Sequence, residues 1–140
     1  MADPLSPVAS VIAIATAASQ ICKAISRLRA FGQVPYRVYV LRNEVTDLEV
    51  VLRQVAQAIE QNSSTPGLKE TSLKPILART KDILLKLATS LEHVSKACNG
   101  GKFINRANIF LKETELFQGF QDDIRTMKSN LTLILGTSNS

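Results

Sequence analysis

The sequence PYRVYVLRNEVTDLEVVLRQVAQAIEQ, residues 35–61, decides the fold. Its apolar residues recur at alternating intervals of three and four positions: Val38, Leu41, Val45, Leu48, Leu52, Val55 and Ile59. This period is that of one face of an α-helix and not that of a β-strand. The opposite face carries the charged residues Arg37, Glu44, Asp47, Arg53 and Glu60. The pattern therefore predicts a helix that begins at Pro35, is solvated on one side and needs neighbouring helices on the other.

A first helix is predicted from Pro4 or Pro7 to about Arg29. Asp3 or Ser6 is its expected N-cap, because proline at the first helical position gives up only an amide that has no partner. Its apolar stripe is Val8, Val11, Ala15, Ala18, Cys22, Ile25 and Leu28, and the further apolar residues Ile12, Ile14 and Ile21 lie off that stripe. Because this helix is apolar on more than one face, we expect it to be the central and most buried one.

A third helix is expected after the Asn-, Ser-, Thr-, Pro- and Gly-rich loop 62–72. Ser72 is its predicted cap, Pro75 lies in its first turn, and the run from Asn99 to Gly101 ends it. Its stripe is Leu73, Leu77, Thr80, Leu84, Leu87, Leu91, Val94 and Cys98.

The last long helix is predicted from about Lys112 to Leu135, with Gly136 ending it. Its stripe is Leu116, Phe120, Ile124, Met127, Leu131 and Ile134. We interpret Gly119, inside this helix, as a point of close helix packing. A short connecting helix is expected over residues 105–110, and residues 136–140 are expected to be a tail or the start of a linker.

The composition fits one domain. With 140 residues, of which 45% are apolar, the chain can fill one core of ordinary size, whereas two domains would each lack core. We therefore predict an all-α fold with a single domain over residues 1–140, a mostly antiparallel bundle of four long helices plus the short connecting helix.

The sequence offers no group of residues suited to catalysis. Its one histidine, His93, falls between stripe positions and is expected to face solvent. Cys22 and Cys98 lie in apolar stretches without the spacing of metal ligands, and the neighbouring Asp122 and Asp123 point about 100° apart on a helix. We therefore expect no enzyme, no catalytic residue, no cofactor and no metal.

Charge and hydropathy bear on partners and location. The net charge of +5 is interspersed along the chain, so we expect no nucleic acid and no small-molecule substrate. Leu5 to Cys22 is a run of eighteen uncharged residues, but Asp3 precedes it and Ala, Ser, Thr and Gln dilute it. A signal peptide or a constitutive membrane span is therefore disfavoured. We expect a cytoplasmic protein whose N-terminal segment associates with a membrane conditionally.

Four blocks of sequence carry a resemblance to a known family. They are MADPLSPVASVIAIATAASQICKAI (1–25), Pro35 with LRNEVTDLEVVLRQV (41–55), ILLKLATSLEHV (83–94) and RANIFLKETELFQGFQDDIRTMKSNLTLIL (106–135). Together they resemble the N-terminal HeLo-like domain of fungal NLR-like (STAND) proteins, which precedes a NACHT or NB-ARC module. Phe110 stands where members of that family often have Trp.

The resemblance implies a signalling domain of innate immunity and heterokaryon incompatibility that executes programmed cell death. In such domains the bundle self-associates and its N-terminal helix is released to a membrane. Carried over to this chain, the candidate membrane and oligomerisation residues are Leu5, Val8, Val11, Ile12, Ile14, Ile21, Lys23, Arg27 and Arg29. The expected partners are further copies of the chain, anionic lipid and another helical bundle. The alternative is a protein-interaction module whose first helix never leaves the core.

Overall fold

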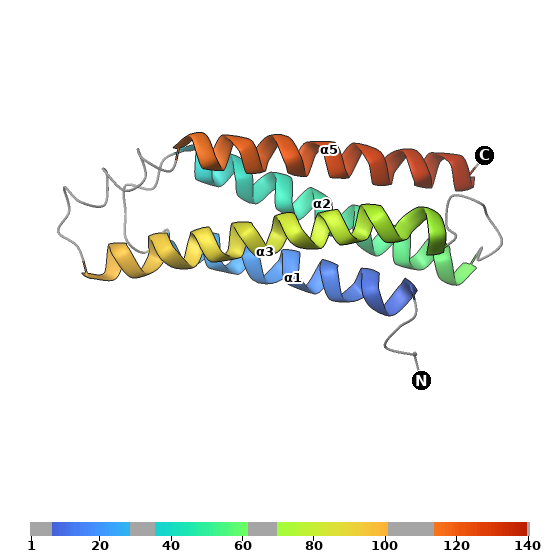
Figure 1. Ribbon diagram of the computed structural model, residues 1–140, viewed down its shortest axis with the longest axis horizontal. Helices are drawn as coiled ribbons and strands as arrows, with labels where there is room; N and C mark the ends of the chain where they lie inside the picture. The colour runs from blue at the N-terminus through green and yellow to red at the C-terminus, as the bar shows by residue number, and fades with distance from the viewer. Residues whose placement is uncertain (1–6, 29–35, 62–69, 101–113, 140) are drawn as a thin grey trace.

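Four long helices make up the described part of the computed structural model (Figure 1). They are α1 (Pro7–Leu28), α2 (Tyr36–Gln61), α3 (Glu70–Gly100) and α5 (Thr114–Asn139). The described residues are therefore 7–28, 36–61, 70–100 and 114–139, with side-chain surroundings described for 8–28, 38–61, 73–96 and 115–136. All of them are helical, and the sequence predicted a helix for all of them except a few residues at helix ends. The candidate caps Asp3 and Ser6 and the short helix expected at 105–110 lie outside these ranges.

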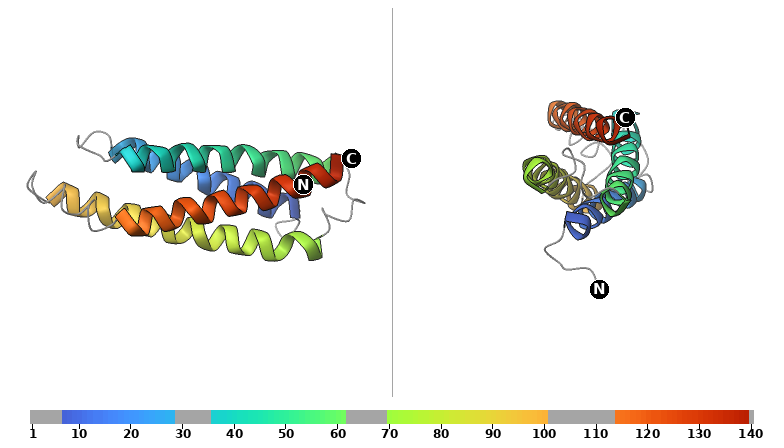
Figure 2. Two further views of the ribbon diagram at one scale, coloured as in Figure 1. Left: turned by 90° about the horizontal axis from the view of Figure 1, so that it is seen from above. Right: turned by 90° about the vertical axis from the view of Figure 1, so that its right-hand side faces the viewer.

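The helices form a ring of four around one interior (Figure 2). Consecutive helices run antiparallel, as expected (Figure 1). In the ring, however, α1 packs against α2 and α3, and α5 packs against the same two helices. The connection from α2 to α3 thus crosses a diagonal, so α1 and α3 are parallel neighbours, as are α2 and α5.

The expectation that α1 is the central helix is wrong. α1 occupies a corner of the ring with two main neighbours, as do the other three helices. A four-helix bundle has no central member, because its interior is shared among four inward-facing stripes. Of the apolar residues that lie off the predicted stripe, Ile14 and Ile21 are buried in this interior, whereas Ile12 is 42% exposed.

The inward stripes are largely those that the sequence predicted. All seven stripe residues of α2 are buried, and so are the seven described stripe residues of α3, from Leu73 to Val94. The one polar member, Thr80, donates a hydrogen bond from Oγ1 to the carbonyl oxygen of Ile76 at 2.7 Å. Its hydroxyl is thus satisfied within its own helix, which makes the buried position tolerable.

α3 begins earlier than predicted, at Glu70. Ser72 is therefore inside the helix and is not its cap, and Pro75 lies in the second turn and not in the first. Leu73, on the N-terminal side of the proline, is fully buried. Burial of a leucine, about 1.5 to 3 kcal/mol, offsets the single amide hydrogen bond that Pro75 cannot make.

α5 departs from the prediction in three places. Phe117, and not Leu116, is the first buried residue of its stripe, since Leu116 is 44% exposed. The helix continues through Gly136 to Asn139, so Gly136 does not end it. A β-carbon added at Gly119 would meet nothing within 4 Å, so the interpretation of Gly119 as a close-packing point is wrong.

Two leucines of α3 provide a matched test of this core. Leu87 is fully buried, whereas Leu85, two positions away, is 55% exposed. Leu87→Ala should lower the free energy of unfolding by about 2 to 5 kcal/mol, because it leaves a cavity in the shared interior. Leu85→Ala should change it by less than about 0.5 kcal/mol. Urea unfolding followed by circular dichroism measures both, and similar losses in the two variants would contradict this packing of α3.

Candidate functional site

The nine candidate residues of the N-terminal segment do not form one surface. Val11, Ile14 and Ile21 are buried in the core, and Val8 packs partly against it. Ile12, Lys23 and Arg27 are exposed. Leu5 and Arg29 lie outside the described residues. A membrane could therefore contact the buried members of this set only if α1 left the bundle.

The outward face of α1 changes character along the helix. Its exposed residues follow a helical spacing: Ile12, Ala13, Thr16, Gln20, Lys23, Ser26 and Arg27. Ile12 is 42% exposed and begins an uncharged half, whereas the C-terminal half carries the two cations. This order places an apolar end and a basic end on the same exposed face.

By length and composition, one described helix could cross a bilayer, and it is α1 over Val8–Leu28. Its 21 residues span about 32 Å, which matches a hydrocarbon core of about 30 Å. The same test is passed by the core helix of a soluble protein and by an N-terminal signal sequence. In the bundle, 33% of the apolar window is buried.

Two hydroxyl groups of α1 are satisfied within the helix itself. Thr16 Oγ1 donates to the carbonyl oxygen of Ile12 at 2.9 Å, and Ser26 Oγ donates to that of Cys22 at 3.0 Å. A hydroxyl that already has its hydrogen bond is cheaper to move into an apolar environment. These side chains therefore add little to the cost of placing α1 in lipid.

Cys22 makes a polar contact between α1 and α2. Its Sγ lies 3.3 Å from Thr46 Oγ1 and 3.9 Å from the carbonyl oxygen of Arg42. Partial burial raises the pKa of the Cys22 thiol, and the charge of Glu49 adds to this, against the opposing effects of Thr46 and Arg42. Cys22 is therefore a neutral, half-buried thiol that packs at the interface between α1 and α2.

The contact between α2 and α5 is charged. Glu44, predicted on the solvated face of α2, has a side chain only 13% exposed and accepts hydrogen bonds from Arg125 Nε at 2.9 Å and Lys128 Nζ at 3.0 Å. Lys128 Nζ also lies 3.5 Å from Asp47 Oδ2. Sequence analysis missed this cluster because the pairing of α2 with α5 is not local. Among the described side chains, α1 forms no ion pair with another helix.

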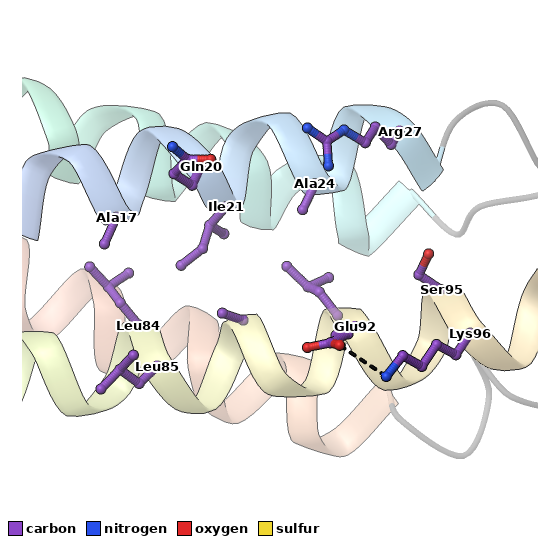
Figure 3. Close-up of a pocket in the computed structure, with 12 residues that line it drawn as sticks. Ala17, Gln20, Ile21, Ala24, Arg27, Leu84, Leu85, Glu92, Ser95 and Lys96 are labelled. Carbon is purple, nitrogen blue, oxygen red and sulfur yellow. Dashed lines mark ion pairs between the residues drawn. The ribbon is translucent and has the colours of Figure 1, made fainter.

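A groove of about 530 Å³ runs between α1 and α3 (Figure 3). Its floor is apolar and consists of the buried residues Ile21, Leu84 and Leu91. Its remaining lining residues are Ala17, Gln20, Ala24, Arg27, Leu85, Ala88, Glu92, Ser95 and Lys96. Arg27 on α1 and Ser95 and Lys96 on α3 lie toward the same end of the groove, on opposite sides of it, and Lys96 Nζ pairs with Glu92 at 3.0 Å (Figure 3).

A second, shallower groove lies between α3 and α5. Leu85, Leu116, Gly119 and Phe120 contribute to it, together with charged residues at its rim. Leu85 borders both grooves, so the exposed face of α3 is hollowed on each side of this leucine. Small or apolar residues at outward positions were the only sign of these two grooves in the sequence. They could not indicate which helix lies opposite.

Sites of other kinds are not evident in the described residues. No three His, Cys, Asp or Glu side chains gather there to hold a metal ion. His93 is exposed, as predicted, and so are Asp122 and Asp123. No family model, curated protein or solved structure matches the chain.

The charged contact predicts a pH dependence of stability. Partial burial acts to raise the pKa of Glu44, but the hydrogen bonds and charges of Arg125 and Lys128 outweigh it and hold this pKa below its ordinary value. The unfolded chain therefore binds more protons as the pH falls toward 4.5, the ordinary value, and below it. The stabilisation is complete above that pH and is lost as the pH falls through the folded value.

Glu44→Gln should accordingly cost about 1 to 2 kcal/mol at pH 7, and its deficit relative to the parent should shrink on acidification. Glu60→Gln, an exposed position of the same helix, is the control and should show no such trend. Urea unfolding between pH 7 and pH 3 measures both. A deficit that is constant over this range would contradict the assigned ion pairs.

Proposed function

We propose that this chain is the N-terminal signalling and cell-death execution domain of a fungal NLR-like receptor. In this proposal it is not an enzyme, and it acts in the cytoplasm by self-association and by transfer of α1 from the bundle to an anionic membrane. The family assignment rests on the resemblance of sequence. The mechanism rests on one observation: the helix with the length and composition of a membrane span occupies a corner of the bundle and forms no described ion pair.

The free energy of burying the apolar side chains of α1 is similar in the bundle core and in a membrane. Release would remove five large aliphatic side chains from the core, namely Val11, Ile14, Ile21, Ile25 and Leu28. Their burial contributes about 8 to 15 kcal/mol in total, at about 1.5 to 3 kcal/mol each. The same side chains are buried again in hydrocarbon, so most of this free energy is recovered in the membrane.

Smaller interactions then decide between the two states. Lys23 and Arg27 are exposed at the C-terminal half of α1, and each contributes about 1 kcal/mol near an anionic lipid surface. The bundle offers in return the weak contact of Cys22 with Thr46. When two states differ by terms of this size, a signal that favours one of them can shift the population substantially.

The second candidate function is a docking module in which α1 stays in place. The observation that favours it is the exposed apolar strip on α3 and α5, where Leu85 and Leu116 border the shallower groove. Amide exchange separates the two functions. Exchange of the α1 amides only with global unfolding favours docking, whereas exchange by local opening favours release.

Ile12 provides the test of membrane association. It is 42% exposed, so Ile12→Glu should leave the bundle folded while placing a carboxylate on the apolar half of α1. We expect this variant to lose at least tenfold in affinity for anionic vesicles, because a charge in the membrane costs about 2.5 to 3.5 kcal/mol. Val50→Glu is the control, since Val50 is 52% exposed on α2 and should bind as the parent does. Vesicle sedimentation and dye leakage measure both properties.

A reversible tether tests release directly. Thr46→Cys, in a Cys98→Ser background, places a second thiol opposite Cys22, whose Sγ lies 3.3 Å from the native Thr46 Oγ1. The oxidised form should hold α1 against α2 and fail to permeabilise vesicles, and reduction should restore leakage. Equal leakage from both forms would contradict release of α1, and absence of binding by the parent would contradict membrane association altogether.

A further inference from the structure

We infer that the groove between α1 and α3 is a binding site for a single-chain amphiphile with an anionic head, a carboxylate or a phosphate. Such a molecule is a ligand and not a substrate. The site uses α1 in its packed position, so the inference goes beyond the proposed function and does not need α1 to move.

The shape of the groove suits one slender apolar chain. Its volume of about 530 Å³ falls within the range of about 300 to 1,000 Å³ that is typical of ligand sites. It extends along α1 from Ala17 to Arg27, a rise of about 15 Å.

The walls are open because small residues stand where larger ones would close them. Ala17 and Ala24 on α1 face α3 across the groove (Figure 3). Ala88, an exposed residue of α3, also lines it. Beneath them the side chains of Ile21 and Leu84 form an apolar floor with no groups that can hydrogen-bond to water. Apolar surface of this kind is covered favourably by a hydrocarbon tail.

The charge at one end determines the head group. Arg27 is exposed at the rim and forms no hydrogen bond or ion pair within the described part of the chain. Lys96 lies at the same end, and the one acidic lining residue, Glu92, already pairs with it. An anionic head placed there would therefore meet a guanidinium with open donors, and Ser95 adds a hydroxyl group.

An occupant of this groove would also affect α1. Since the tail contacts both α1 and α3, it binds the packed state and not a state in which α1 has left. At a free concentration one hundred times its Kd, the population of the open state would fall about one hundredfold. This consequence rests on the proposed function, whereas binding itself does not.

Calorimetric titration with dodecanoate and dodecyl phosphate, each below its micellar concentration and without vesicles, tests the site. The parent should bind at least one of them in a one-to-one complex, and the tighter one identifies the head group. Ala88→Leu should weaken binding at least tenfold by filling the groove, whereas Ala78→Leu, at an exposed position of α3 outside the groove, should not. Arg27→Gln should weaken binding about tenfold, and Lys23→Gln, exposed on α1 but not lining the groove, should have little effect.

Three results would overturn the inference. The first is no binding by the parent, and the second is equal binding by the Ala88→Leu variant. The third is binding of dodecyltrimethylammonium, which has the same tail and a cationic head, as tightly as dodecanoate. A fourth result would also overturn it, and sedimentation of the same samples without amphiphile measures it. If the parent forms a dimer that Ala88→Leu abolishes, the groove binds a second copy of the chain. Because no vesicle is present, these results do not depend on those of the membrane experiments.

Discussion

A helix at the corner of a four-helix bundle turns only part of its circumference toward its neighbours, and α1 is apolar over more than that part. Val11, Ile25 and Leu28 are buried in the shared interior, while Ile12 and several alanines face solvent or a groove. This surplus of apolar surface is the constraint on which the other features depend. It lines one wall of the groove toward α3, it provides the exposed apolar half of α1, and on the proposed mechanism it also suits the helix to a membrane.

Periodicity predicted the secondary structure and the inward faces well, because both are local. Every stripe residue of α2 is buried. At the start of α5 the prediction was wrong by one position, because Phe117 is buried and the predicted Leu116 is exposed. Helix ends were predicted less well, because Ser72 and Gly136 are residue types typical of helix ends and yet both lie inside helices. The position of α1 was predicted wrongly because a count of apolar residues does not distinguish burial in a core from a surplus that remains outside.

The candidate site depended on which helices are neighbours, and no local pattern contains that information. The chain crosses a diagonal between α2 and α3, so α1 lies parallel to α3 and α2 lies parallel to α5. Only then do Arg27 and Lys96 reach the same end of one groove, and only then does Glu44 meet Arg125. The sequence did indicate the exposed cations Lys23 and Arg27, because their charge alone placed them on the outer face.

The helices are attached to their neighbours in different ways, and the proposed mechanism depends on this difference. α5 is held to α2 by charged groups around Glu44, and separating them in an apolar environment would leave charges unpaired at high cost. α1 is held mainly by aliphatic contacts, which are not directional and which hydrocarbon can replace. Its departure would uncover Leu84 and Leu91 on the remaining helices, and this apolar strip is stable only when another surface covers it. When α1 leaves, its own apolar face and the apolar strip of the remaining helices both become exposed. On the proposed mechanism the membrane covers the first surface and self-association of the remaining helices covers the second, so the two processes occur together.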